Sequence, residues 1–191
     1  MLALKAKVLV ICTLVFVLLL SVENSYAADL TSNSFKRGPG GGGGGTQLTQ
    51  PEIDSLLYMR EEEKLARDSY LTLYDKWGLQ IFSNIASSEM IHMSKIKDLL
   101  DRYGLPDPAA GHPVGAFTNP VLQQLYDDLM VQGSQSPTEA LKVGVTIEEV
   151  DIQDLQHYLS LTNRTDIIQV YTNLMNASYN HLSAFNNQLG Q

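Results

Sequence analysis

The sequence predicts an all-α protein, a four-helix bundle with one long crossover connection and a short extra helix. In four long segments, apolar residues recur at the three- and four-residue spacing of amphipathic helices. Helix-start signals precede these segments, and short links join the first to the second and the third to the fourth. A hydrophobic fraction of 44% in 191 residues is sufficient for one core, so we expect one folded domain.

The first pair of helices is expected in residues 50–76 and 81–103. The first follows the capping signal Thr49–Glu52, and Gly78 ends it. The second ends at Gly104, a residue that commonly terminates helices. The short link between them makes the pair antiparallel.

The second pair follows a long connection that is rich in glycine and proline and includes a short helix over 121–131. The third helix begins at the capping box Ser136–Glu139 and continues to about Leu161. The fourth is capped by Asn163 and ends near Gln188. A connection of this length can return the chain along the whole bundle.

The first residues, 1–27, have the pattern of an export signal. Lys5 and Lys7 precede the apolar run Val8–Leu20, and the small-residue exit Ser25–Ala27 follows. A run of about thirteen apolar residues is shorter than the ~20 that a membrane-spanning helix needs, so an uncleaved membrane anchor is the weaker alternative. We therefore expect a secreted or otherwise extracytoplasmic protein.

Residues 28–45 are polar, end in a glycine run and predict a flexible linker, so the folded domain is expected at 46–191. Without the signal segment, 11 basic and 20 acidic residues remain, a net charge near −9. This charge argues against nucleic acid as a partner. The single cysteine, Cys12, lies in the signal segment, so disulfides and thiolate chemistry are excluded from the mature chain.

Polar residues interrupt the apolar stripe of every long helix near its middle. An ionised carboxylate in an apolar interior must be protonated, paired or bound to metal, and several converging on one layer favour a cation. The strongest local pattern has a glutamate and a histidine three residues apart, which project from one helical face. The residues concerned, in chain order, are Glu63, Glu89, His92, Glu148, Asp151, Ser178 and His181.

Short motifs around these residues resemble those of known proteins. The stretch Glu63–Tyr70 resembles the Glu-x-x-Ala-x-x-x-Tyr motif on the first helix of rubrerythrin-type proteins, and Glu89–His92 resembles their Glu-x-x-His motif. Glu148–Asp151 is similar to the paired acids of their third helix, and His181 falls where a second Glu-x-x-His would end. The string Tyr58–Arg67 also resembles a ferritin-like family known only as a domain of unknown function.

The resemblance implies a ferritin-like bundle that holds one or two ions of iron or manganese. Ser178 stands where the pattern expects a glutamate, so one carboxylate of a standard two-metal site is absent. Asp151 follows Glu148 by one helical turn and is the candidate to replace it. The implied metal ligands are Glu63, Glu89, His92, Glu148 and His181, with Asp151 in addition.

Alternative interpretations of these residues remain open. Glu63 lies in the charged run Arg60–Lys64, and a shift of one residue in the stripe would expose it to solvent. His92 can be a core histidine bonded to a neighbouring carboxylate, and Glu149 competes with Glu148 for the inward position.

The leading hypothesis for function is a secreted metal-binding protein that handles oxygen, peroxide or metal oxidation. An enzyme of this kind would be a di-metal oxidase or peroxidase and would need an external electron donor, since no cysteine pair is present to hold an iron–sulfur centre. The competing hypothesis is a non-catalytic structural or interaction module that has lost a complete site. Whether the domain forms a homodimer stays open.

Overall fold

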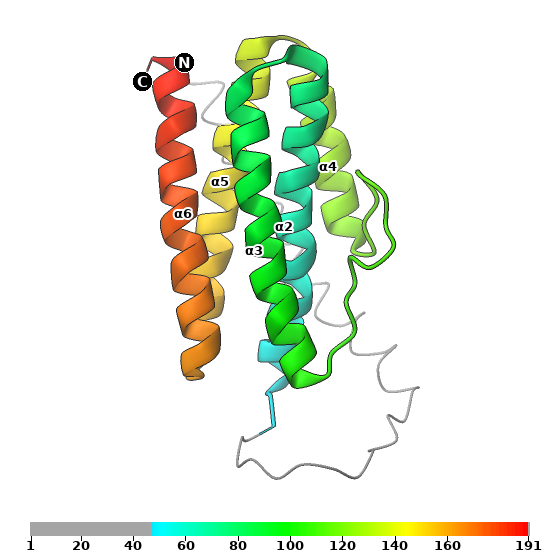
Figure 1. The fold of residues 1–191 in the computed structure, drawn as a ribbon, viewed down its shortest axis with the longest axis vertical. Helices are drawn as coiled ribbons and strands as arrows, with labels where there is room; N and C mark the ends of the chain where they lie inside the picture. Colours follow the sequence, from blue (N-terminus) through cyan, green and yellow to red (C-terminus); the bar gives the residue numbers. More distant parts are fainter. Residues whose placement is uncertain (1–46, 191) are drawn as a thin grey trace. The chain divides into compact units, whose positions relative to one another are not determined.

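The computed structural model describes residues 47–190, and this part of the chain contains five helices and no strand (Figure 1). It confirms the expected all-α class. No helix among the described residues is long and apolar enough to cross a membrane. The predicted signal segment and linker lie outside the described residues. The helices are α2 (Gln50–Trp77), α3 (Gln80–Tyr103), α4 (Pro120–Gly133), α5 (Pro137–Leu159) and α6 (Thr165–Leu189).

The four longest helices lie side by side, with α2 antiparallel to α3 and α5 antiparallel to α6 (Figure 1). Helix α2 packs along α3, and α5 packs along α6. The two pairs meet where α2 contacts α5 and where α3 contacts α6, while α4 packs against α2 and α5. The apolar stripes meet in the centre, and fully buried side chains include Leu56, Met59, Phe82, Leu100, Leu155 and Ile167.

Local capping signals account for most of the helix ends. Gly104 ends α3 in the left-handed conformation, with φ of 69°. The side chain of Asn119 accepts hydrogen bonds from the first turn of α4, and Ser136 accepts one from Glu139 N at the start of α5. The short extra helix is longer than expected, because Pro120 is already its first residue.

The start of α6 differs from the prediction. Arg164, and not Asn163, is the N-cap residue, and it makes no side-chain capping bond. Instead Arg164 N donates to Thr162 Oγ1, and Thr162 Oγ1 donates to Glu52 Oε1 at the start of α2. A tertiary contact therefore replaces the local cap that the sequence indicated.

Helices α5 and α6 approach closely at Gly144. A Cβ atom added there would lie 2.5 Å from Cε1 of Phe185, so only glycine fits without displacing the ring. Phe185 in turn contacts Tyr70 and Phe82, with ring centroids 5.4 and 5.7 Å apart. This aromatic cluster links α2, α3 and α6.

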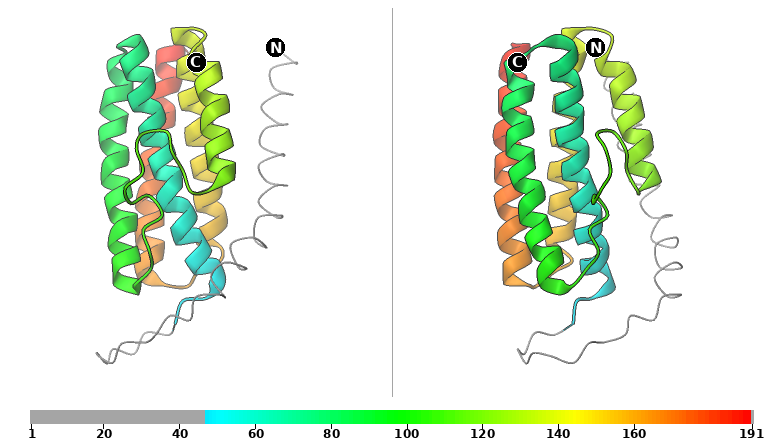
Figure 2. Two further views of the ribbon diagram at one scale, coloured as in Figure 1. Left: turned by 90° about the vertical axis from the view of Figure 1, so that its right-hand side faces the viewer. Right: turned by 45° about the vertical axis from the view of Figure 1, so that its right-hand side comes forward.

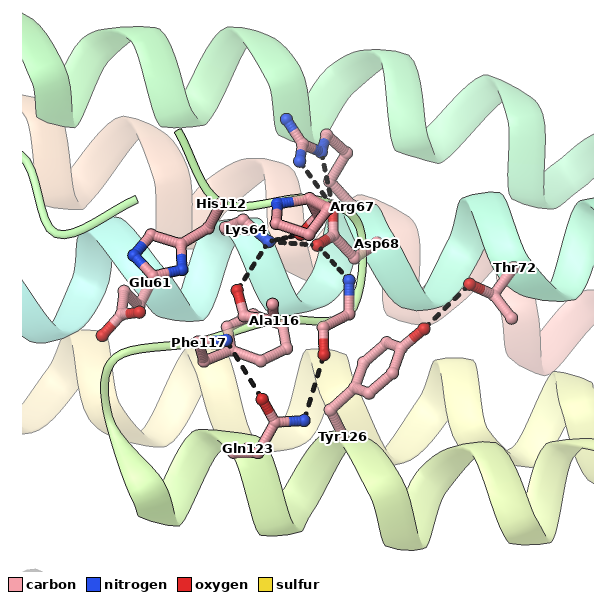
Figure 3. A network of polar contacts seen from close by, with 12 residues as sticks. Glu61, Lys64, Arg67, Asp68, Thr72, His112, Ala116, Phe117, Gln123 and Tyr126 are labelled. Carbon is pink, nitrogen blue, oxygen red and sulfur yellow. Dashed lines mark hydrogen bonds and ion pairs between the residues drawn. The ribbon is translucent and has the colours of Figure 1, made fainter. Parts of the chain in front are cut away.

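The crossover segment, residues 104–119, runs across α2 (Figure 2) and is joined to it by a buried polar network (Figure 3). Lys64 Nζ donates to the carbonyl oxygens of Pro113 and Ala116 at 2.8 and 3.0 Å and forms an ion pair with Asp68. Asp68 also accepts a hydrogen bond from Gly115 N. Both charged side chains are almost wholly buried, at 1% and 0% exposure. The network therefore fixes the crossover against α2.

We expect Asp68→Asn to destabilise the domain by about 3 kcal/mol, because it leaves the buried Lys64 ammonium without a counter-charge. Urea unfolding followed by circular dichroism measures the change. Asp75→Asn is the matched control, since Asp75 lies exposed on the same helix and its loss should cost less than about 0.5 kcal/mol. Equal stability of the two variants would show that the Lys64–Asp68 pair does not hold the crossover in place.

Candidate metal centre

The residues that the sequence singled out meet in the middle of the helical unit. Each long helix contributes at least one of them, since the polar positions lie at similar heights on the four inward faces. The carboxylates are buried, with exposures of 2 to 6%, and the side chains of His92 and His181 are 9% and 12% exposed. They are Glu63 on α2, Glu89 and His92 on α3, Glu148 and Asp151 on α5, and Ser178 and His181 on α6.

One group of possible ligands joins α2 to α3. His92 Nδ1 lies 2.6 Å from Glu89 Oε2 and 3.2 Å from Glu63 Oε2. The three-residue spacing of Glu89 and His92 on α3 places both on the face that meets Glu63. Glu63 Oε1 has no hydrogen-bond partner among the described residues. One imidazole nitrogen and two carboxylates therefore converge on a single point.

A second group joins α3 to α5 and α6. His181 Nδ1 lies 2.9 Å from Glu89 Oε1 and 3.5 Å from Glu148 Oε2. Although these atoms are close, neither His181 Nδ1 nor Glu89 Oε1 makes a directed hydrogen bond within the described residues. The other oxygen of Glu148 accepts a hydrogen bond from Tyr70 Oη at 2.6 Å. Tyr70 thereby orients the carboxylate of Glu148.

Glu89 belongs to both groups, with one oxygen facing each. Within each group, one ligand atom from every residue lies within 4.8 Å of the others. The rings of His92 and His181 also lie near each other, 5.7 Å between centroids. Two neighbouring groups that share a carboxylate would suit a pair of metal ions, with Glu89 available to both.

Asp151 lies at the edge of this cluster. Ser178 Oγ donates a hydrogen bond to Asp151 Oδ2, and Asp151 Oδ1 has no partner among the described residues. Burial, followed by the negative charges of Glu63 and Glu148, raises the pKa of Asp151 well above its usual range. Asp151 is not part of either 4.8 Å group. Asp151, which was expected to supply the missing carboxylate, therefore lies beside the two groups. It is hydrogen-bonded to Ser178, the residue that stands where a glutamate was expected.

The electrostatics of the cluster are those of acids and bases that compete for a few protons. Burial raises the pKa of Glu63 to about 8 and that of Glu148 to about 7. Burial opposes ionisation of Glu89 as well, but contacts with His181 and His92 hold its pKa at about 2. Protons on this cluster supply the positive charge that a cation would otherwise provide.

The two histidines are correspondingly basic. Burial lowers their pKa, but the neighbouring carboxylates outweigh it and raise the pKa of His92 to about 11 and that of His181 to about 9. For His92 the carboxylates are Glu63 and Glu89, and for His181 they are Glu148 and Glu89. Metal ions must therefore displace protons from the imidazoles to bind.

Two buried acids next to the cluster were not singled out from the sequence. Glu62 is 3% exposed and Asp154 is 8% exposed. Glu62 lies in the charged run Arg60–Lys64, next to side chains of α4 and α5. The burial of Asp154 could have been predicted from the sequence, because Asp154 follows Asp151 by three residues and lies on the same face of α5.

Taken together, the helices and the buried cluster define an all-helical protein with a cluster of carboxylates and histidines in its interior. The family model described as an uncharacterized protein domain (DUF2202) matches residues 52–191, so the chain belongs to the DUF2202 family. The expected membership of a helical family known only as a domain of unknown function is confirmed.

Relatives support the family and the fold. The chain is 51% identical over 138 residues to the uncharacterized protein MJ0754 of Methanocaldococcus jannaschii, a match covering 72% of this chain and 75% of that protein. The crystal structure of the hypothetical protein MJ0754 superposes with a TM-score of 0.75 at 48% identity, covering 78% of this chain and 86% of that chain. A DUF305 fragment from Deinococcus radiodurans has a TM-score of 0.56 at 14% identity, covers 75% and 98% of the two chains, and supports the helical fold alone.

Proposed function

We propose that this protein is a secreted metal-binding protein with a ferritin-like four-helix bundle, which holds two ions of iron or manganese in its core. The observation that carries the proposal is the convergence of two ligand groups on one buried carboxylate, Glu89. Carboxylate and imidazole ligands without thiolates suit these ions. The proposed ligands are Glu63, Glu89, His92, Glu148 and His181.

Charge balance supports two ions and gives Asp151 a role. Two divalent ions bring four positive charges, whereas Glu63, Glu89 and Glu148 supply three negative ones. A net charge in a buried layer is costly, so a fourth carboxylate is needed close by. Asp151 would provide it, since its Oδ1 atom has no hydrogen-bond partner among the described residues. In this arrangement Ser178 supplies no carboxylate itself but donates a hydrogen bond to the carboxylate of Asp151.

The proposed chemistry is the handling of oxygen or peroxide, or the oxidation of the metal itself. Bound iron or manganese would supply the redox change, while the protein binds and orients the ions. Tyr70 holds one oxygen of Glu148, which leaves the other free to face the ions. His92 and His181 reach the surface more than the carboxylates do, so a small oxidant is expected to approach along the edge between α3 and α6. Electrons for repeated turnover would come from an external donor.

The stoichiometry of metal binding tests the proposal. We expect the metal-free mature domain to bind two Mn²⁺ ions per chain when it is titrated at pH 7.5 and followed by calorimetry and elemental analysis. Asp151→Asn should lower the occupancy to one ion, because the second would bring an uncompensated charge. A folded wild-type domain that binds no manganese, iron or cobalt would favour the non-catalytic structural module instead.

A further inference from the structure

One buried acid near the proposed centre, Glu62, accepts no hydrogen bond from a donor among the described residues. In the charged run on α2, Arg60 pairs with Asp107, Lys64 pairs with Asp68, and the Glu61 oxygens accept hydrogen bonds from the crossover segment. By contrast, neither carboxylate oxygen of Glu62 has a hydrogen-bond partner among the described residues, although Glu62 is 3% exposed. The carboxyl group of Asp154 can hydrogen-bond to Glu62 when one of the two acids is protonated. A buried carboxylate that accepts no other hydrogen bond costs stability, so its presence points to a ligand or a passing charge.

Two further acids face Glu62 from α5. Asp151 and Asp154 lie three residues apart on one face of that helix, and the negative charges of both act on Glu62. Asp151 Oδ1 is also without a partner among the described residues. A cavity of about 10 Å³, lined by Glu62 and mostly by apolar side chains of α2, α4 and α5, has room for a particle the size of a water molecule. The interface between α2 and α5 thus contains three neighbouring carboxylates, and two of them, Glu62 and Asp151, have oxygens that accept no hydrogen bond among the described residues.

The row extends from near the surface to the proposed metal centre. At its outer end Asp154, 8% exposed, accepts a hydrogen bond from Tyr58 Oη and lies close enough to the exposed His157 for the two to interact electrostatically. At its inner end Asp151 interacts electrostatically with Glu63 and Glu148. Glu62 lies between these two ends.

We propose that Asp154, Glu62 and Asp151 form a carboxylate path along which a divalent cation passes between solvent and the metal centre. This inference rests on the proposed function, because the path leads to the proposed metal centre. A cation that moves from one carboxylate to the next keeps a negative partner at each step, which lowers the desolvation cost of crossing the interior. A resident third site is disfavoured, because in the described residues these three acids do not bring their oxygens within 4.8 Å of one another as the two ligand groups do.

Rapid mixing of the metal-free protein with Co²⁺, followed by the visible absorption of the bound ion, tests the path. The variants are Glu62→Gln and Asp154→Asn, which keep the side-chain shape and remove the charge. We expect loading to slow by about tenfold or more in each variant, with the final amount of cobalt per chain unchanged. Glu149→Gln is the matched control, because it removes the same charge from a half-exposed position on α5 and should load at the wild-type rate.

Release of the ion to a chelator provides the second measurement. A path serves both directions, so Glu62→Gln should slow release by the same factor as loading and leave the affinity unchanged. Loss of a ligand would do the opposite and speed release. Circular dichroism checks folding, which should be retained because glutamine keeps the shape of the buried side chain.

Three outcomes would overturn the path. Unchanged loading in both variants would show that metal enters elsewhere, for instance past His92 and His181. A lower final cobalt content would make Glu62 or Asp154 a resident ligand. A wild-type protein that takes up no cobalt would overturn the proposed function itself, and the path with it, whereas the first two outcomes leave that function intact.

Discussion

Glu89→Gln should abolish the binding of both metal ions. Glu89 directs one oxygen toward the group with Glu63 and His92 and the other toward the group with Glu148 and His181. Glutamine keeps the shape but has no negative charge to bridge two cations. The loss of affinity should exceed the roughly 10- to 100-fold loss that follows removal of an outer hydrogen-bond partner of a metal ligand. Calorimetric titration with Mn²⁺ measures it.

Two further variants show whether the effect is specific to the shared carboxylate. Glu63→Gln removes a ligand from one group only, so it should leave one ion bound. Glu149→Gln, at the half-exposed position next to Glu148, should leave two. Thermal melts confirm that each variant is folded at the titration temperature. Full occupancy in Glu89→Gln would mean that Glu89 is not a ligand and that the two groups do not form one centre.

The metal-free protein should lose stability as the pH rises from 5 to 9. Glu63 and Glu148 have folded-state pKa values of about 8 and 7, above the 4.5 of an ordinary glutamate. His181 and His92 have values of about 9 and 11, above the ordinary 6.5. Across this interval the folded state therefore binds more protons than the unfolded state does. Stability falls with pH under that condition, by a total on the order of several kcal/mol.

Below pH 5 the sign reverses because of Glu89. Its pKa of about 2 is depressed from 4.5, so its contribution to stability is present above pH 4.5 and is lost as the pH falls through 2. We therefore expect the metal-free protein to be most stable near pH 5. Urea unfolding at pH 3, 5, 7 and 9 in the presence of a chelator measures this profile.

Saturating Mn²⁺ should reverse the trend above pH 5. Metal ions bind the deprotonated ligands, so their affinity increases as the protons leave. Because the ions bind the folded state, the gain in melting temperature on adding Mn²⁺ should be larger at pH 8 than at pH 6. A metal-free protein that becomes more stable between pH 5 and pH 9 would contradict the proton competition described for this cluster.

The amino-acid sequence was sufficient to predict which residues of each helix face inward. Helical periodicity relates residues three and four positions apart, so the burial of Glu63, Glu89, His92 and Glu148 follows from their place in apolar stripes. Local sequence signals also predicted the helix start where the capping residue is close in sequence, as at Ser136 in α5. Where a distant residue supplies the contact, as at the start of α6, the local signal was misleading.

The burial of charged residues on the other faces of α2 could not be predicted in the same way. Lys64 and Asp68 have the spacing of a solvated ion pair, yet the crossover segment covers them (Figure 3). Glu62 belongs to the same charged run and is covered by α4 and α5. Periodicity describes one helix at a time and carries no information about which other segment packs over a given face.

The sequence by itself determined the helical class, the inward face of each helix and the candidate ligands, because these depend on the regular geometry of a single helix. Only the tertiary structure decided that Glu89 is shared between two groups, that Ser178 holds Asp151, and that no hydrogen-bond donor among the described residues reaches Glu62. Those facts depend on the rotation and axial register of one helix against another. Packing between residues far apart in the chain sets both.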